Sequence, residues 1–191
     1  MGDYTVIDDI EETLKVILKQ GLDDVFGVDK VEITFDTPKD PKDDTENKVL
    51  VFLYQIVENI FLKNEEPERL DDGQLKNPPQ YLDILYLIIP YGKDKKLILG
   101  KVMQIFFDNA VLKGTVLQKG LSGSDDQIKI IFNPLSLDDL TKLWSAFKDV
   151  SFRLSVSYMI TPLRIDSSRT LGTSRVISSE LGFYNNIPER K

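Results

Sequence analysis

Two long runs of alternating and β-branched residues constrain the fold of this chain most strongly. YLDILYLIIPYG, residues 81–92, holds most of a strand predicted at residues 80–90, and FRLSVSYMITPLRID, residues 152–166, contains a strand predicted at residues 152–163. Both strands finish with the pattern Tyr-x-Ile-x-Pro, which suits a duplicated domain, a repeated binding element or two strands of one sheet. A predicted helix follows the first run but a tail follows the second, so no unit of fixed period repeats. We therefore expect two strands of one sheet, each ended by its proline, Pro90 or Pro162, because proline cannot extend a ladder.

The other hydrophobic patterns predict a single α+β domain. The run at residues 48–64 also suits a buried helix, but its β-branched and aromatic content favours a strand. The predicted helices cover residues 4–21, 93–107 and 136–149, and the predicted strands cover residues 30–36, 48–64, 80–90, 126–134 and 152–163. We expect a mainly antiparallel or mixed, twisted sheet packed by three helices. This domain is predicted at residues 1–165, followed by a C-terminal arm at residues 166–191 that is rich in Ser, Gly and Arg.

Several residues are assigned local roles in these helices. Gly21 is expected to stop the first helix, and Ser136 to cap the last one together with Asp139. Gly100 lies inside the second helix at a cost of about 1 kcal/mol relative to Ala, which predicts close packing there. The buried face of that helix is expected to hold Leu99, Val102, Met103 and Phe106. Aromatic residues on core-facing positions are predicted to be core rather than a base-stacking surface: Tyr81, Tyr86, Phe106, Phe107, Trp144, Phe147 and Tyr158.

The residue types that are missing narrow the possible chemistry. The chain has no Cys and no His, which excludes disulfides, thiolate nucleophiles, imidazole bases and nearly all zinc, copper and iron sites. Adjacent Asp pairs such as Asp125 and Asp126 lack the spacing of a calcium loop, and GLSGSDD lacks the ending of a phosphate-binding loop. We therefore predict no catalytic residues, no metal and no cofactor.

Charge is unevenly distributed along the chain. The net charge is −7, which argues against nucleic-acid binding. Residues 152–191 nevertheless carry +3, and residues 1–151 carry −10. An acidic body with an Arg-bearing tail indicates head-to-tail contacts between copies, because Arg is well suited to interfacial ion pairs. The alternative is a solvated tail without a role. The residues predicted at subunit or partner interfaces are Arg153, Arg164, Arg169, Arg175, Val176, Ile177, Leu181 and Phe183.

Taken in order, the segments resemble a known family. The features that carry the resemblance are YTVIDDIEETL, VFLYQIVENIFLKN, LDILYLIIPYG running into LILGKVMQIFFDNAVLKG, and LSLDDLTKLWSAFKDVSFRLSVSYMITPLRIDS. Together they cover residues 4–168 and are similar to the cap, or tail-terminator, proteins of phage-tail-like contractile injection systems. The resemblance implies a structural, non-enzymatic protein that forms a hexameric ring. This ring would sit on the terminal subunits of the inner tube and the contractile sheath and end their polymerisation.

This resemblance also implies where the protein acts and with what. Its partners would be its own copies and terminal tube and sheath subunits, with no nucleic acid and no membrane insertion. Assembly is expected in the bacterial cytoplasm, as part of a particle released from the cell. One alternative is a small ligand- or protein-binding domain with a pocket between helix 93–107 and the sheet. An enzyme that uses Mg²⁺ and Asp pairs is a third, weaker alternative.

Overall fold

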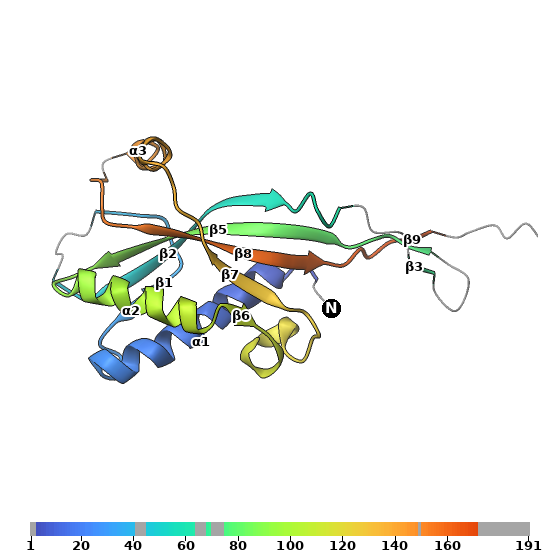
Figure 1. The fold of residues 1–191 in the computed structure, drawn as a ribbon, viewed down its shortest axis with the longest axis horizontal. Coiled ribbons are helices and arrows are strands. Elements are labelled where there is room, and N and C mark those ends of the chain that lie inside the picture. The colour runs from blue at the N-terminus through green and yellow to red at the C-terminus, as the bar shows by residue number, and fades with distance from the viewer. Residues whose placement is uncertain (1–2, 41–44, 64–67, 70–74, 149, 172–191) are drawn as a thin grey trace, which may run out of the picture.

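A mixed six-stranded sheet lies at the centre of the computed structural model, which describes residues 3–40, 45–63, 68–69, 75–148 and 150–171. The strand order is β1-β2-β5-β8-β7-β6, in which only β1 and β2 run parallel. The strands of this sheet are β1 (Glu32–Thr34), β2 (Lys48–Glu58), β5 (Gln80–Tyr91), β6 (Val111–Leu112), β7 (Ile128–Phe132) and β8 (Val156–Ile165). A small second sheet at one end of the molecule joins β3 (Glu68–Arg69), β4 (Leu75–Lys76) and β9 (Thr170–Leu171) (Figure 1).

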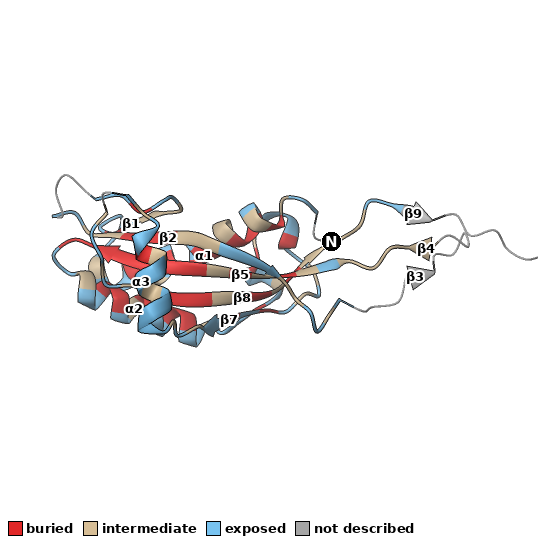
Figure 2. Cartoon of the chain, turned by 90° about the horizontal axis from the view of Figure 1, so that it is seen from above, coloured by how far each residue is buried: buried red, intermediate tan, exposed pale blue. Residues whose placement is uncertain are grey.

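Helices cover the two faces of the large sheet unequally. The helices α1 (Val6–Phe26) and α2 (Lys95–Asp108) lie together on one face, while α3 (Leu137–Ser145) lies on the other (Figure 1). The main core therefore lies between α1, α2 and the sheet, and a smaller core forms around Trp144 of α3, with Leu87 and Ile89 of β5. Buried residues follow the central strands β5 and β8 for most of their length (Figure 2).

The twin runs are neighbouring strands of this sheet. In the antiparallel pair β5–β8, Tyr86 lies directly opposite Tyr158. This confirms two strands of one sheet, but the expectation that the prolines end them is wrong. β5 continues past Pro90 to Tyr91, and β8 continues past Pro162 to Ile165. At Pro162 the pairing shifts, so that Thr161 and Pro162 both face Asp83; a bulge of this kind accommodates a residue without an N–H.

Neither Gly21 nor Gly100 has the role that the sequence predicted. α1 does not stop at Gly21 but runs on to Phe26. A Cβ atom at Gly21 would lie 2.5 Å from Cδ1 of Ile105, so α2 packs closely against this glycine and a larger residue would require Ile105 to shift. A Cβ atom at Gly100 would meet nothing within 4 Å, which rules out the close packing predicted at that position.

The core predictions hold for most of the aromatic residues. Tyr86, Phe106, Trp144 and Tyr158 are buried, and Tyr81 and Phe147 are half-buried. Phe107 and Met103 of α2, in contrast, were expected in the core and are exposed; the side chain of Phe107 is 82% exposed. Consecutive residues on a helix point about 100° apart, so Phe107 turns outward once Phe106 faces the sheet.

Candidate assembly surfaces

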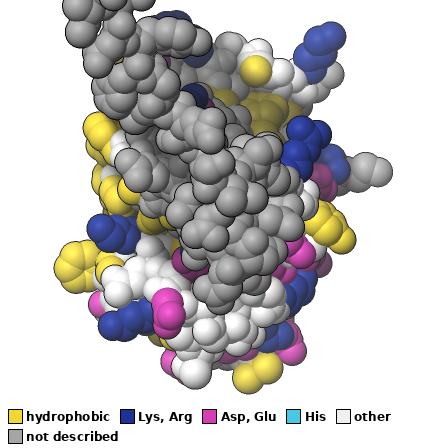
Figure 3. All heavy atoms as spheres, turned by 90° about the vertical axis from the view of Figure 1, so that its right-hand side faces the viewer, with side chains coloured by type: hydrophobic (Ala, Val, Ile, Leu, Met, Phe, Trp, Pro, Cys, Tyr) yellow, Lys and Arg dark blue, Asp and Glu magenta, His cyan; other side chains and the backbone are white. Residues whose placement is uncertain are grey.

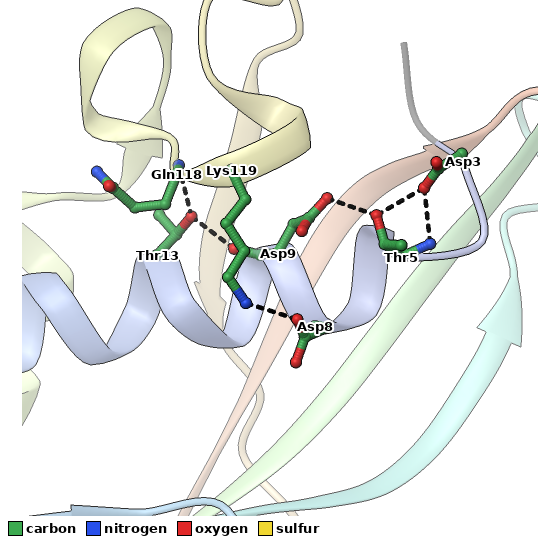
Figure 4. A network of polar contacts seen from close by, with 7 residues as sticks. All are labelled: Asp3, Thr5, Asp8, Asp9, Thr13, Gln118 and Lys119. Carbon is green, nitrogen blue, oxygen red and sulfur yellow. Dashed lines mark hydrogen bonds and ion pairs between the residues drawn. The ribbon is translucent and has the colours of Figure 1, made fainter.

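A polar network fixes the segment 113–124 against the start of α1 (Figure 4). The Thr13 hydroxyl accepts a hydrogen bond from the backbone N–H of Gln118 at 3.0 Å. Lys119 Nζ lies 2.6 Å from Asp8 Oδ2, and Asp9 is buried and accepts from the Thr5 hydroxyl at 2.9 Å. The segment carries two 3₁₀ turns, η1 (Gly114–Val116) and η2 (Lys119–Leu121). Asp8 therefore helps to hold this segment against α1 through Lys119, while Asp9 binds Thr5 at the start of α1 itself.

Glu11, a residue of the same helix, carries a half-buried carboxyl group. The Tyr86 hydroxyl donates to Glu11 Oε1 at 3.3 Å. Burial raises the pKa of Glu11, although the hydrogen bond from Tyr86 opposes the shift. Burial also raises the pKa of Tyr86 strongly, with a further contribution from the nearby charge of Glu11. Both groups belong to the core between α1 and the sheet, and this pair gives the folded chain a dependence on pH.

Among the described residues, no group of three or more Asp, Glu, His or Cys side chains could hold a metal ion. The described part of the chain also contains no helix both long and apolar enough to cross a membrane. Seen from the end where β3, β4 and β9 lie, acidic and basic side chains are interspersed with hydrophobic ones (Figure 3). Three other features of the described surface could take part in assembly: an apolar groove, the edge of strand β7 and the contacts of the arginine side chains.

An apolar groove runs between α2 and the strands β7 and β8. Its volume is about 300 Å³, and it is lined by Met103, Phe106, Phe107, Ala110, Ile130, Phe132 and Tyr158. The ring of Tyr158 forms its floor, with edge-to-face contacts to Phe106 at 4.8 Å and to Phe132 at 5.5 Å. Burial raises the pKa of the Tyr158 hydroxyl. A groove thus lies where the alternative interpretation placed a pocket, and exposed aromatic rings form its rim.

The strand that borders this groove has a partly uncovered edge. β6 pairs with Ile128 and Lys129 of β7, and the N–H of Ile130 donates to the carbonyl oxygen of Ala110 at 2.9 Å. On the other side of β7, the backbone N–H of Asn133 donates to the carbonyl oxygen of Ser157 in β8 at 2.9 Å. Because backbone groups alternate between the two sides of an antiparallel strand, those of Phe132 point away from β8. No strand of the described chain lies beside them.

Arg153, predicted at an interface, is engaged inside the chain. Its Nη2 lies 3.2 Å from Asp40 Oδ1, and its guanidinium lies 4.8 Å from the centre of the Tyr91 ring. Asp40 also accepts from the backbone N–H of Ser151 at 3.2 Å and from its hydroxyl. The backbone hydrogen bond from Ser151, followed by Arg153, lowers the pKa of the Asp40 carboxyl. These contacts tie the segment before β8 to the loop after β1.

The other predicted interface residues lie toward the arm. Arg164 Nε, in β8, lies 2.7 Å from Asp166 Oδ1, where the chain leaves the large sheet. Arg169 is exposed, next to β9. Arg175, Val176, Ile177, Leu181 and Phe183 lie outside the described residues. The structure does not bring Arg153, Arg164 and Arg169 together into one cluster: Arg153 precedes β8, Arg164 lies near its end and Arg169 follows it.

The sequence predicted a pocket between α2 and the sheet only as an alternative, and its exposed apolar rim was not predicted, although two signals for that rim were present. Two aromatic residues in succession, Phe106 and Phe107, cannot both face the core from one helix. β7 likewise ends in Ile131 and Phe132, both exposed, where strict alternation would bury only one of them. An apolar residue on the outward position of a half-buried strand or helix is the pattern that indicates a docking surface.

Three comparisons with known proteins bear on this fold. A family model described as the Pvc16 N-terminal domain matches residues 9–179. A cryo-EM structure of the PVC sheath/tube terminator of an extracellular contractile injection system, in the extended state, is similar with a TM-score of 0.69 and 19% identity; the match covers 98% of this chain and 67% of that chain. The cap of the anti-feeding prophage, its tube terminating cap, is similar with a TM-score of 0.63 and 18% identity, over 93% of this chain and 60% of that one.

No curated protein sequence matches the chain significantly. The structural matches confirm the predicted class of a single α+β domain with a mixed sheet and three helices. The chain spans only part of both solved proteins, at 67% and 60% of their lengths.

Proposed function

The chain belongs to the Pvc16 N-terminal domain family, as the resemblance in its sequence predicted, and on this basis we propose that it caps a contractile injection particle. In this role it ends the polymerisation of the inner tube and the sheath. The observation that carries the proposal is the fold similarity over 98% of the chain to a sheath/tube terminator. The match to a tube terminating cap supports the same role.

The proposed working form is a ring of six copies. Closed rings need heterologous contacts, in which one patch of a subunit meets a different patch on the next. The opposite net charges of residues 1–151 and 152–191 supply two such patches. Arg169, which is exposed next to β9, takes part in these contacts, and Arg175 and the apolar residues of the arm are proposed to share this role. Arg153 and Arg164 act differently, because each already faces a carboxylate of its own chain.

The proposed role divides the chain into a body, residues 1–165, and an arm, residues 166–191. The body rests on the terminal tube and sheath subunits, and the arm reaches a neighbouring copy. The role requires no cofactor, no nucleic acid and no membrane insertion. Assembly takes place in the bacterial cytoplasm, and the finished particle leaves the cell.

Assembly in the absence of this chain tests the proposal. Tube and sheath proteins of the same particle are produced with and without it, and their lengths are measured by negative-stain electron microscopy. With the chain, lengths are expected to be uniform; without it, they should spread and the sheaths should detach. A length distribution that does not change on adding the chain would refute the capping role.

The oligomeric state is tested separately. The full chain and a version that ends at Leu171 are compared by mass photometry over a range of concentrations. We expect the full chain to form rings alone or on tube ends, and the shortened version to stay folded but associate more weakly. A full chain that remains monomeric both alone and in the presence of tube and sheath would contradict the ring.

A further inference from the structure

We propose that the apolar groove between α2 and β7 accepts residues 176–183 of a second copy of this chain, which add a short strand to the open edge of β7. This inference deepens the proposed function and rests on it, because it names the contact that joins one ring subunit to the next. The observations behind it concern the backbone edge, the groove and the sequence of the arm.

The backbone of β7 selects an extended occupant. The N–H and C=O of Phe132 point toward the uncovered side, beyond the point where β6 stops pairing. Backbone groups at a strand edge are satisfied by another strand, which adds main-chain hydrogen bonds without any special side chain. A helix or a compact small molecule in the groove would not offer these groups the main-chain partners that a strand offers. The occupant is therefore a piece of extended chain.

The side chains of the groove select an apolar face on that occupant. Phe107 is 82% exposed and Phe132 is 47% exposed, and Met103 lies on the same rim. Ile130 and Phe132 alternate with Lys129 and Ile131, so one face of an added strand lies over the groove while the other faces solvent. The occupant thus needs mainly apolar residues at every second position and mainly small or polar residues between them.

Residues 176–183 have this pattern. Their sequence is VISSELGF, in which Ile177, Leu181 and Phe183 share one face of an extended chain with Ser179. Val176, Ser178, Glu180 and Gly182 lie on the opposite face. Three of the four residues on one side are apolar and match the groove, and the opposite side, which has no large apolar residue after Val176, matches the exposed position that an added edge strand occupies.

The point where the arm starts favours a second copy as the source of the strand. β9, the last described strand, pairs with β4 in the small sheet at the far end of the molecule, whereas the groove lies beside α2 (Figures 1 and 2). An arm that leaves from the far end reaches outward to a neighbour, while a return to its own groove has to run back along its own sheet. A contact between arm and groove is also heterologous, as a ring requires.

A binding experiment tests the groove directly. The acceptor is the full-length chain with its own arm disabled by Ile177→Ser, Leu181→Ser and Phe183→Ser. The probe is a fluorescent peptide of residues 174–185, followed by anisotropy. We expect Phe107→Ser in the acceptor to weaken peptide binding by about tenfold or more, from the loss of one buried aromatic contact.

The matched control is Leu97→Ser, at a residue of α2 that is 67% exposed and does not line the groove. It should leave peptide binding unchanged, and circular dichroism should show that both acceptors are folded. Equal peptide binding by the Phe107→Ser and Leu97→Ser acceptors, or no peptide binding at all, would overturn the proposal.

Disulfide trapping tests which copy provides the strand, and the chain contains no native Cys that would interfere. Ile131→Cys and Glu180→Cys lie on the same, solvent-facing side of the proposed pairing. Two single-cysteine variants are mixed, oxidised and separated on a non-reducing gel. A crosslinked dimer is expected from this pair, and none from Val28→Cys mixed with Glu180→Cys.

A disulfide that closes within one chain carrying both cysteines, while the mixed single variants stay unlinked, would overturn the role of a second copy. Both experiments use the purified chain without tube or sheath. A failure of capping therefore shows in the length distributions alone, and a failure of the arm–groove contact shows here.

Discussion

Replacing Gly21 by Ala tests the packing between α1 and α2, because two opposing effects meet at this position. In an exposed helix interior, Gly→Ala stabilises by about 1 kcal/mol through helix propensity. At Gly21, however, the new Cβ would lie 2.5 Å from Cδ1 and 2.6 Å from Cγ1 of Ile105. Ile105 is buried, so it cannot move aside freely, and overpacking of this kind costs about 1–3 kcal/mol. The net expectation is that Gly21→Ala lowers the free energy of unfolding by about 0–2 kcal/mol.

Gly100→Ala is the matched control, since Gly100 lies in a helix with nothing within 4 Å of its added Cβ. It should stabilise by about 1 kcal/mol, so the two variants should differ by about 1–3 kcal/mol. In thermal unfolding, each kcal/mol shifts Tm by about 2–4 °C in a chain of this length. Urea titration at 25 °C would give the free energies directly.

Ile105→Val completes the experiment by removing Cδ1, the nearest atom to the new Cβ. We expect the combination of Gly21→Ala and Ile105→Val to be more stable than the sum of the single effects, with a coupling of about 0.5 kcal/mol or more. If Gly21→Ala stabilises the chain as much as Gly100→Ala does, then α1 and α2 do not pack as described.

Three further predictions concern other parts of the body. Ser136→Ala should lower the free energy of unfolding by about 1 kcal/mol in urea titrations, because the N-cap hydrogen bond of α3 is lost. Glu11→Gln should stabilise the chain at pH 7, because the raised pKa of Glu11 means that stability is lost as the pH rises through that pKa. The Gln side chain can still accept the hydrogen bond from Tyr86. The difference in unfolding free energy between the two chains should vanish below pH 4.5, the ordinary pKa of Glu. Asp40→Asn should destabilise the chain at pH 7, and this effect should shrink as the pH falls below the ordinary value of 3.8, because a lowered pKa gives stability that is lost as the pH falls through it. An effect that stays constant as the pH falls would argue against the contact with Ser151.

The sequence allowed the main elements to be predicted because their signals were local and strong. The two runs with Tyr-x-Ile-x-Pro became the central pair β5–β8, and the cap at Ser136 was confirmed by its hydrogen bond from the N–H of Asp139 at 3.1 Å. The strand predicted over residues 48–64 forms, but it ends at Glu58. Beyond that point the apolar residues Ile60 and Phe61 are exposed, and no part of the described chain covers them.

The errors arose where tertiary contacts override a local rule. Glycine commonly ends helices, but Gly21 is explained by a side chain on another helix, Ile105, which the local pattern does not show. Proline commonly ends a strand, but a bulge opposite Asp83 accommodates Pro162 in β8. The exposure of Phe107 was open to prediction from helical geometry, whereas the open edge of β7 depends on how far β6 pairs with it, which the sequence does not reveal.

The most direct measurement for the account is a cryo-EM reconstruction of both ends of a particle assembled with this chain. The account predicts a six-fold ring of the chain on the last tube and sheath subunits at one end, with density of an arm in the groove between α2 and β7 of the neighbouring copy. A particle whose tube and sheath end without this chain, or a chain bound along the sheath at no fixed position, would contradict it.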